Sequence, residues 1–465
     1  MKGFLVAGTA SGVGKTTVSL AILAAMRRRD IRVQPFKGGP DFLDTGHLSR
    51  ISGRTARNLD TWMLSAESNI SSVMDATHDA DAILVEGMMG LFDGKSGDSE
   101  IGSSAEIAKL LKLSVVLVLD ASKSARSLAA VVLGFEMFDR DLSLAGIILN
   151  RVASERHYQL LKTAILDTCK TPILGWLPRE SSISIPERHL GLQTSEETIG
   201  REESALQFEA LAKLAEKHLD LDHLTALECG LDLRPNTQIA SSIPQNLVRI
   251  GVARDHAFSF YYEDNFDLLR QNGAGIISFS PLNDSKLPPD LDALYLGGGF
   301  PELYASQLGA NIPMLASIRA FISAGKPVYA ECGGMIYLSS TLTTADGITH
   351  PMAGVLPFSM EMTDKLVQFG YVTVQFTRDS LLGPCGTTVR GHSFHYSRIA
   401  NDASLPTSYS VNYSLSGKQQ AEGYVLGNVL ASYIHLHFRA NSAIAGHFIS
   451  AACNAQTASS ILSLS

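Results

Sequence analysis

A glycine-rich loop near the start of the chain limits the folds open to this sequence more than any other feature. The loop covers residues 8–17, ends in Gly-Lys-Thr-Thr, and lies between a short apolar strand and a segment with a helical pattern. This arrangement binds triphosphates, because backbone N–H groups and the positive end of the helix dipole surround the phosphates. We therefore expect an N-terminal phosphate-loop (P-loop) α/β domain with a doubly wound parallel sheet.

The side chains of this loop have separate expected roles. Lys15 would reach the β- and γ-phosphate oxygens, and the hydroxyl of Thr16 would hold Mg²⁺. Five residues separate Gly8 from Gly14, one more than in the common motif. A chance glycine-rich turn is the alternative, which the Gly-Lys-Thr-Thr ending disfavours. The expected nucleotide contacts in the loop are Gly12, Val13, Gly14, Lys15, Thr16 and Thr17.

Two later apolar segments end in polar residues that fit the same site. Residues 82–85 lead into Glu86, whose carboxylate would hold Mg²⁺ directly or through water. Residues 146–149 lead into Asn150, whose amide could read the adenine edge as a further ATP contact. For Glu86 the alternative is a surface acid at the end of a strand.

Carboxylates also follow the second expected strand. Residues 34–47 are rich in proline and glycine, so we expect a loop at the edge of the sheet where doubly wound folds bind ligands. There Lys37 could neutralise a phosphoryl group in transfer, and Asp41 and Asp44 could coordinate a second Mg²⁺ or orient a substrate. Asp60 is a further candidate metal ligand beside Thr16 and Glu86. A solvated turn is the alternative, since Pro-Asp is common in turns.

The length of the chain and its strand pattern indicate two domains. A chain of 465 residues exceeds the size at which a single core stops growing. We expect a phosphate-loop domain over residues 1–222, a linker over 223–247, a second α/β domain over 248–445, and a loosely held tail over 446–465. The linker contains two prolines and lacks periodicity, and the tail is rich in Ser and Ala.

Composition excludes several classes of partner. The formal net charge of −8 argues against nucleic acid and against an anionic membrane, because both attract basic surfaces. No stretch reaches the roughly 18–20 apolar residues of a transmembrane helix. The 5 cysteines are scattered and show neither metal-ligand spacing nor a disulfide framework. A reducing cytoplasm is the expected location.

A nucleophile is expected in the second domain at Cys332. An apolar strand meets Cys-Gly-Gly and then a helical pattern, and such a turn places the thiol at a helix N-terminus, which favours the thiolate. The backbone N–H of Gly333 and one from the glycine loop at Gly299 could form an oxyanion hole. A buried structural cysteine is the alternative.

Four histidines could supply the base that such a nucleophile needs. His435 and His437 lie on one face of an expected strand, and His392 and His395 form a second pair. All four follow the cysteine in the chain, which is the order expected for a nucleophile and its downstream base.

Together these motifs resemble the cobyrinate a,c-diamide synthase family of corrinoid biosynthesis over nearly the whole chain. The N-terminal half is similar to dethiobiotin synthetase, which shares the extended phosphate loop, and the C-terminal half resembles the α/β domain of class I glutamine amidotransferases. The segments that carry the resemblance are residues 8–17, 37–44, 58–63, 86–87, 253–262, 297–302, 331–334, 390–397 and 433–438.

The resemblance implies a carbon–nitrogen ligase that amidates the a and c acetates of cobyrinate or hydrogenobyrinate through acyl phosphates. It implies Cys332 as the glutaminase nucleophile and His435 as its base. In most class I glutaminases a glutamate lies two residues after that histidine, and here His437 occupies that place, which leaves the third member of the triad open. Phe42 stands where many members have Tyr, so no role of that hydroxyl carries over. The implied partners are a cobyrinate-type tetrapyrrole, glutamine and ATP with Mg²⁺, and a homodimer is one assembly that the chain could form.

Two other functions stay open at this level. A partition-type regulatory ATPase uses the same phosphate loop, but it usually carries an additional lysine early in the loop, where this chain has Thr9, Ala10 and Ser11. Such an ATPase also has no use for the Cys332–His435 pair. A nickel-sirohydrochlorin a,c-diamide synthase shares the motifs, so a substrate test must separate it.

Overall fold

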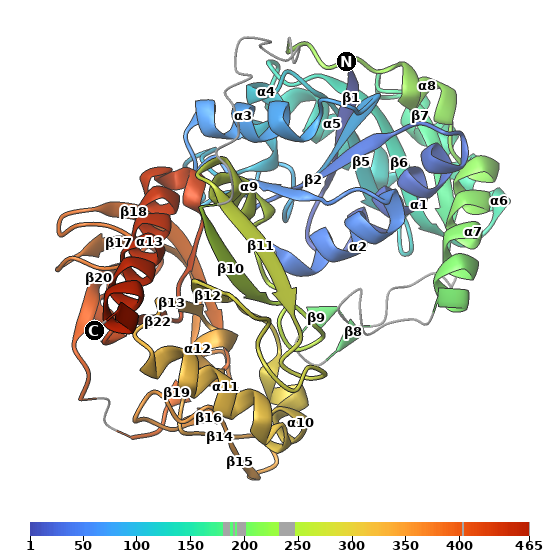
Figure 1. Ribbon diagram of the computed structural model, residues 1–465. Helices are drawn as coiled ribbons and strands as arrows, with labels where there is room; N and C mark the ends of the chain where they lie inside the picture. Colours follow the sequence, from blue (N-terminus) through green and yellow to red (C-terminus); the bar gives the residue numbers. More distant parts are fainter. Residues whose placement is uncertain (180–186, 189–190, 193–200, 232–246, 402–403, 465) are drawn as a thin grey trace. The chain divides into compact units, whose positions relative to one another are not determined.

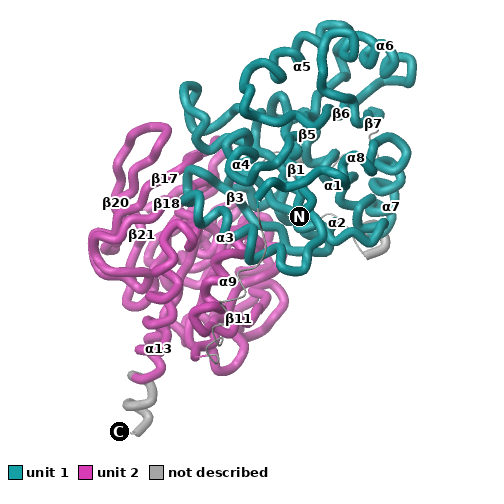
Figure 2. Tube along the Cα trace, turned by 90° about the horizontal axis from the view of Figure 1, so that it is seen from above, with its two compact units in different colours: residues 1–237 teal, residues 238–465 magenta. Residues whose placement is uncertain are grey.

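Two compact units, residues 1–237 and 238–465, make up the chain in the computed structural model (Figure 2). The structure describes residues 1–179, 187–188, 191–192, 201–231, 247–401 and 404–464. Each unit has its own sheet and its own hydrophobic clusters. Among the helices in the described ranges, none has the length and apolar character needed to cross a membrane.

The first unit is built on a seven-stranded sheet whose neighbouring strands are all parallel, in the order β3-β2-β4-β1-β5-β6-β7. The central strand β1 is buried on both faces: Phe4 and Val6 belong to one hydrophobic cluster, and Leu5 and Ala7 to the other. A strand buried on both faces has a continuous apolar sequence, as this one does. The strands are β1 (Lys2–Gly8), β2 (Val33–Gly38), β3 (Arg57–Leu59), β4 (Ala82–Glu86), β5 (Ser114–Asp120), β6 (Leu144–Val152) and β7 (Ile173–Pro178).

Helices cover both faces of this sheet (Figure 1). Helices α1 and α7 pack against each other and contribute to the first cluster, whereas α4, α5 and α6 contribute to the second. This is the doubly wound architecture that the phosphate loop predicts. The helices are α1 (Lys15–Arg28), α2 (Phe42–Ser52), α3 (Ala66–Ala76), α4 (Ser104–Leu110), α5 (Ser127–Phe138), α6 (Glu155–Leu166), α7 (Arg201–His218) and α8 (Leu221–Ala226). The short strands β8 (Glu187–Arg188) and β9 (Gly191–Leu192) pair antiparallel.

The second unit has a ten-stranded sheet in the order β11-β10-β12-β13-β22-β21-β20-β17-β18-β23. Its strands run parallel from β11 to β22 and antiparallel beyond β22. The parallel part comprises β10 (Val248–Ala253), β11 (Ala274–Phe279), β12 (Ala293–Leu296), β13 (Val328–Glu331) and β22 (Val429–Ser432). The antiparallel part comprises β17 (Gln368–Phe376), β18 (Thr388–His395), β20 (Thr407–Tyr413), β21 (Gln419–Leu426) and β23 (His435–Leu436).

A small sheet and further helices complete the second unit. The small sheet has the order β15-β14-β16-β19, with β14 (Thr341–Thr343), β15 (Thr349–Pro351), β16 (Met360–Met362) and β19 (Ser397–Ile399). The helices are α9 (Glu263–Gln271), α10 (Ala305–Ala310), α11 (Ile312–Ser323), α12 (Gly333–Leu338) and α13 (Ala443–Leu464), with 3₁₀ turns η2 (Pro301–Tyr304) and η3 (Phe438–Ala440). The expected α/β character of both halves is confirmed.

The expected loop over residues 34–47 is wrong at both ends, because residues 34–38 belong to β2 and α2 begins at Phe42. Asp41 explains the start of the helix: its Oδ1 accepts hydrogen bonds from the backbone N–H groups of Leu43 and Asp44, 2.9 Å away in each case. Such an N-cap stabilises a helix by about 1 kcal/mol. Gly46 lies inside the helix, at a cost of similar size that the cap offsets.

The structure also differs from the expected domain ends. Residues 223–231 of the expected linker pack on the first unit, where α8 ends at Ala226 and the N–H of Gly3 donates to the carbonyl of Leu227 at 2.9 Å. Residues 232–246 of that linker lie outside the described residues. The expected tail is mostly helix α13, whose side chains Phe448 and Ala452 are buried in the core of the second unit.

Candidate functional site

The phosphate loop joins β1 to α1 and requires glycine at two positions. Gly12 and Gly14 have positive φ angles of 76° and 95°. A Cβ on Gly14 would lie 2.0 Å from the Nδ2 atom of Asn150, which no side chain can tolerate. Gly14 is also the N-cap residue of α1, so the first backbone N–H groups of this helix meet no capping side chain and suit a phosphate. Val13 and Thr17, the other expected contacts, lie in this loop and in the first turn of α1.

Asn150, near the end of the parallel strand β6, supports the phosphate loop through its side chain. Its Nδ2 donates to the carbonyl of Val13 at 2.9 Å, and its Oδ1 accepts from the backbone N–H of Arg151 at 2.9 Å. The side chain is buried. The adenine contact expected of this amide stays a prediction, because one N–H and one lone pair of the amide remain available beside these two bonds.

Lys15 lies across the loop. Its Nζ donates to the carbonyl of Met89 at 2.5 Å and to that of Ala10 at 3.2 Å. Burial lowers the pKa of Lys15 and the charge of Lys37 lowers it further, while nearby carboxylates oppose both effects. Replacing two carbonyl acceptors by phosphate oxygens would therefore stabilise the charged ammonium.

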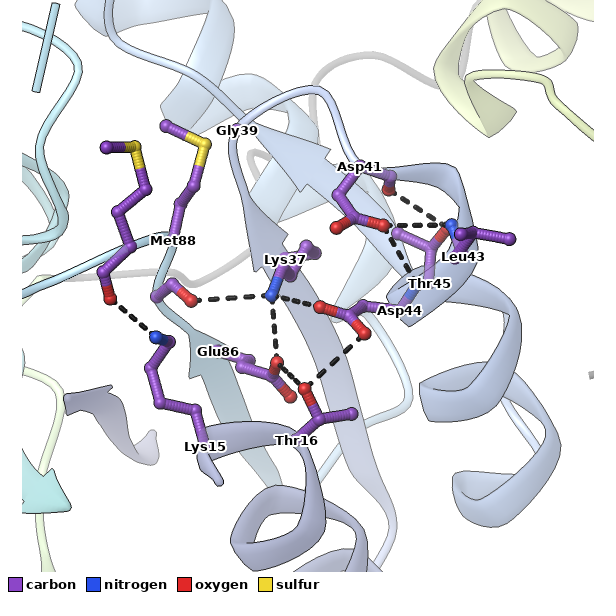
Figure 3. A network of polar contacts seen from close by, with 12 residues as sticks. Lys15, Thr16, Lys37, Gly39, Asp41, Leu43, Asp44, Thr45, Glu86 and Met88 are labelled. Carbon is purple, nitrogen blue, oxygen red and sulfur yellow. Dashed lines mark hydrogen bonds and ion pairs between the residues drawn. The ribbon is translucent and has the colours of Figure 1, made fainter. Parts of the chain in front are cut away.

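Thr16, Lys37, Asp44 and Glu86 form one buried polar network (Figure 3). Lys37 Nζ lies 2.5 Å from Asp44 Oδ2 and 2.8 Å from Glu86 Oε1. The hydroxyl of Thr16 donates to Glu86 Oε1 at 2.7 Å and lies 3.4 Å from Asp44 Oδ1. The ends of β2 and β4 and the starts of α1 and α2 thus bring four of the predicted site residues together.

The charges of this network are unbalanced. Burial alone would lower the pKa of Lys37, but Asp44 and Glu86 raise it well above its ordinary value. Burial likewise acts to raise the pKa of Asp44, but Lys37 holds it below its ordinary value, whereas burial raises the pKa of Glu86. The Lys37 ammonium therefore faces two carboxylates, which also act on the ammonium of Lys15.

The donor set at Glu86 fits Mg²⁺. Within the described residues, the buried Oε2 atom of Glu86 has no hydrogen-bond partner. A threonine hydroxyl and a carboxylate are hard oxygen ligands, and Mg²⁺ usually binds few protein groups together with waters and substrate phosphates. In the described part of the chain, no three His, Cys, Asp or Glu side chains are arranged to hold a metal by themselves. A metal here would therefore depend on the nucleotide.

Two of the predicted carboxylates, Asp41 and Asp60, make capping contacts with the backbone. Asp41 caps α2, and burial together with the charge of Asp44 raises its pKa to about 6. Asp60, 1% exposed, accepts with Oδ1 from the backbone N–H groups of Trp62 and Met63 at 2.9 and 2.7 Å. These bonds make Asp60 the cap of the turn after β3, and metal ligation by Asp60 stays a prediction.

Sequence reasoning missed the loop after β4. Besides the carbonyl of Met89, this loop supplies Asp93, whose Oδ2 accepts from the N–H of Gly90 at 2.8 Å and whose charge raises the pKa of Lys15. The three closely spaced glycines at positions 87, 90 and 94 were the available signal.

Cys332 lies on a strained turn between β13 and α12. Its φ of 45° and ψ of −100° are unusual for a residue with a side chain. The following glycines make the turn feasible, since a Cβ on Gly334 would lie 2.1 Å from the carbonyl oxygen of Leu296. The thiol is 7% exposed and lies at the N-terminus of a helix. This is the geometry of a nucleophile elbow.

The two expected oxyanion residues lie side by side. The N–H nitrogen of Gly299 would be 3.1 Å from a Cβ on Gly333. Gly299 has a φ of 156°, and a Cβ there would lie 2.0 Å from the carbonyl oxygen of Ala257, so glycine is required. The role of these two N–H groups in binding an oxyanion stays a prediction.

His435 is buried on β23, 2% exposed, and its ring lies against Gly298. Burial alone would lower its pKa, but contacts with Cys332 and Glu331 raise the pKa to about 9. The structure thus brings the predicted nucleophile and the predicted base together. Glu331, which sequence reasoning did not single out, is the carboxylate beside them: its Oε2 lies 3.6 Å from His435 Nδ1.

His437 has a different environment. Its ring stacks on Tyr262 with centroids 4.5 Å apart, and its Nε2 lies 3.9 Å from Asp264 Oδ2 on α9. Burial lowers its pKa to about 4. His437 therefore connects the segment that follows β23 to α9.

Comparisons with known proteins match both units. The family described as "CobQ/CobB/MinD/ParA nucleotide binding domain" matches residues 4–192, and the family described as "CobB/CobQ-like glutamine amidotransferase domain" matches residues 249–443. The cobyrinate a,c-diamide synthase of Syntrophotalea carbinolica is 43% identical over 449 residues, which are 96% of this chain and 97% of that protein. Proteins of the same name from Listeria monocytogenes and Salmonella typhimurium are 41% and 42% identical over 456 residues, 97% of this chain and 99% and 98% of theirs.

Proposed function

The chain belongs to the cobyrinate a,c-diamide synthase family, and we propose that its first unit activates the substrate carboxylates while its second unit releases ammonia from glutamine. The protein is a glutamine-dependent amide synthase that uses ATP in cobalamin biosynthesis. The family, the activity and the fold class expected from the sequence are thereby confirmed.

In the second unit the proposed nucleophile is Cys332. The thiol gives its proton to His435, and the thiolate attacks the side-chain amide carbon of glutamine. The C–N bond then breaks, His435 returns the proton to the leaving nitrogen, and ammonia departs from a glutamyl thioester. Water hydrolyses the thioester to glutamate. The N–H groups of Gly299 and Gly333 would bind the oxyanion formed in both steps.

In the first unit the proposed reaction is phosphorylation of a carboxylate. A carboxylate does not react with ammonia, because hydroxide is a very poor leaving group. An oxygen of the substrate carboxylate therefore attacks the γ-phosphorus of ATP and displaces ADP, and ammonia then displaces phosphate from the acyl phosphate. Lys15 and Lys37 neutralise charge on the phosphoryl group in transfer. Asp44 holds Lys37, and Asp41 orients the start of α2.

Thr16 and Glu86 are the proposed metal ligands. Mg²⁺ held there would supply positive charge that offsets the negative charge of the phosphates. In the structure Lys37 bonds to Glu86. When ATP is bound, its ammonium group would donate to the phosphoryl oxygens. Asp60 is the weaker candidate, because its carboxylate already caps a turn.

The a and c acetates of cobyrinate or hydrogenobyrinate are the proposed acceptors. A nickel-sirohydrochlorin substrate uses the same chemistry, so mass spectrometry of the product decides between them. With cobyrinate or hydrogenobyrinate, ATP and glutamine, we expect two successive amidations. If neither corrinoid gains two amides while nickel-sirohydrochlorin does, the proposed acceptor is wrong. A homodimer stays a prediction.

The strained turn at Cys332 beside the buried His435 carries the glutaminase assignment. A Cys332→Ser variant should lose glutamine-dependent amidation and keep amidation with free ammonium, because the ATP site is in the other unit. Retention of glutamine-dependent turnover in this variant would overturn the assignment.

A further inference from the structure

Glu331 immediately precedes the nucleophile, and its carboxylate lies beside the base. Oε2 of Glu331 is 3.6 Å from Nδ1 of His435, and the two side chains are 1% and 2% exposed. Strand β13 carries Glu331 and the distant strand β23 carries His435. The fold of the sheet, and no local motif, therefore brings the two side chains together.

Three buried donors fix the orientation of this carboxylate. The hydroxyl of Tyr329 donates to Oε1 at 2.6 Å, and the backbone N–H of Leu436 donates to the same oxygen at 3.0 Å. The hydroxyl of Tyr295 donates to Oε2, the oxygen that faces His435, at 3.0 Å. Donors on both oxygens leave the carboxylate little freedom to rotate.

The backbone around His435 is held as firmly as the carboxylate. Asn265 on α9 donates from Nδ2 to the carbonyl of Leu436 at 2.9 Å, and its Oδ1 accepts from the N–H of Phe438 at 2.8 Å. Together with the bond from the N–H of Leu436 to Glu331, these contacts hold β23 on both sides. The distance between the imidazole and the carboxylate is thus set by the fold.

We propose that Glu331 is the positioning residue of the glutaminase site and completes a triad with Cys332 and His435. It directs Nδ1–H of the imidazole toward its carboxylate and leaves Nε2 for the thiol. When the thiol proton moves to Nε2, a thiolate and an imidazolium form. The carboxylate of Glu331 balances the charge of the imidazolium, and the proton stays on the imidazole. This inference rests on the proposed glutaminase function.

The two histidines that face His435 cannot balance the charge of its imidazolium. His392 stacks on the His435 ring with centroids 5.1 Å apart, and burial lowers its pKa well below the ordinary value. Burial also lowers the pKa of His395 to about 4. Both rings are therefore neutral at pH 7. Glu331 and the Cys332 thiolate are the anionic groups that raise the pKa of His435 against the effect of burial.

The test compares Glu331→Gln with Glu422→Gln in the full-length enzyme. Glu422 is an equally buried carboxylate of the same sheet, and it accepts from the hydroxyl of Ser432 at 2.6 Å and from the N–H of Tyr433 at 2.7 Å. Its replacement controls for the loss of a buried carboxyl group that accepts hydrogen bonds from its neighbours. The measurements are glutamine- and ammonium-dependent amidation, and the pH dependence of Cys332 alkylation by iodoacetamide.

We expect Glu331→Gln to lower the glutamine-dependent kcat by about 100-fold or more and to keep the ammonium-dependent activity. Alkylation of Cys332 at pH 7 should slow by about tenfold, because the imidazolium that stabilises the thiolate loses its counter-charge. The alkylation rates of variant and unmodified enzyme should converge as the pH rises above the pKa of His435, about 9, because a neutral imidazole needs no counter-charge. Glu422→Gln should leave the shape of this pH profile unchanged.

An unchanged pH profile in Glu331→Gln, or the same change in Glu422→Gln, overturns the inference. If Glu331→Gln misfolds and loses the ammonium-dependent activity too, Glu331→Asp decides. Aspartate keeps the negative charge but places it farther from His435. The pH profile of Cys332 alkylation in this variant must therefore lie between those of the unmodified enzyme and a free thiol, and an unshifted profile contradicts the proposal. If Cys332→Ser loses glutamine-dependent activity while Glu331→Gln keeps it in full, only the role of Glu331 is refuted. If Cys332→Ser keeps glutamine-dependent activity, the glutaminase assignment itself is refuted.

Discussion

Asn150 donates a hydrogen bond from its side-chain amide to the backbone carbonyl of Val13, 2.9 Å away, and so ties the end of β6 to the phosphate loop. The two residues are 137 positions apart in the chain. The contact holds the loop at a point where Gly14 can carry no side chain, because Asn150 already fills that space. The shape of the phosphate loop thus depends on a strand that is distant in the sequence.

Asn150→Ala should therefore weaken binding of the phosphates rather than recognition of the base. It leaves the buried carbonyl of Val13 without its donor, which costs about 1–3 kcal/mol, or roughly tenfold or more in affinity. Calorimetric titration with ATP and with inorganic tripolyphosphate checks this, and both affinities should fall alike. If ATP binding alone weakened, Asn150 would read adenine, as the sequence first indicated.

Lys37→Met should destabilise the first unit in a pH-dependent way. Lys37 holds the pKa of Asp44 below its ordinary value, so this pair contributes stability above the unfolded pKa of Asp44 and loses it as pH falls through the lower folded pKa. Without the ammonium, Asp44 and Glu86 repel each other, at a cost of about 3–5 kcal/mol. Protonation relieves the repulsion, so scanning calorimetry should show a larger loss of Tm at pH 8 than at pH 5.

The double variant Lys37→Met/Glu86→Gln is the control for this prediction. It removes one of the two carboxylates and should recover much of the lost Tm at pH 8, yet it should have no ATP-dependent amidation. An equal loss of Tm in the single variant at both pH values would show that the two carboxylates do not repel each other.

Glu422→Gln should change how stability depends on pH. Burial raises the pKa of Glu422 from 4.5 to about 7, so the folded state binds its proton more tightly than the unfolded state. The stability that protonation provides is present below the unfolded pKa and is lost as pH rises through the folded pKa near 7. A pKa of about 7 in place of 4.5 sets an upper limit of about 3 kcal/mol on this contribution. The variant lacks this dependence, so its Tm relative to the unmodified protein should be higher at pH 8.5 than at pH 5.

The sequence predicted those parts of the site that are contiguous in the chain. The phosphate loop and the turn at Cys332 each combine strand, glycines and helix within about a dozen residues, so local rules suffice. Glu331 and His437 show what such rules miss. The packing of β13, β23 and α9 decides which of these two side chains faces His435. Spacing in the sequence placed His437 at the position of the usual glutamate and left the third triad member open. In the structure the ring of His437 stacks on Tyr262.

The ends of helices were misjudged for a related reason. Proline and glycine argued for a loop through residue 47, but the cap at Asp41 lets α2 begin at Phe42. The Ser- and Ala-rich end of the chain has weak amphipathic character, yet Ile444, Phe448 and Ala452 recur every four residues and are buried in the second unit. Tertiary packing supplies the stability that composition did not reveal.

Gly12 and Gly14 form a matched pair for testing how tightly the phosphate loop is built. Both have positive φ, so alanine at either position costs about 1–2 kcal/mol of backbone strain. They differ in surroundings: a Cβ on Gly12 would meet no described atom within 4 Å, whereas a Cβ on Gly14 would lie 2.0 Å from Asn150 Nδ2. Gly12→Ala should therefore weaken tripolyphosphate binding modestly, and Gly14→Ala should abolish it at accessible concentrations. Because the clash is with Asn150, the double variant Gly14→Ala/Asn150→Ala should bind better than Gly14→Ala alone, although each change separately weakens binding. Additive losses in this cycle would mean that Gly14→Ala fails through backbone strain and not through a clash with Asn150.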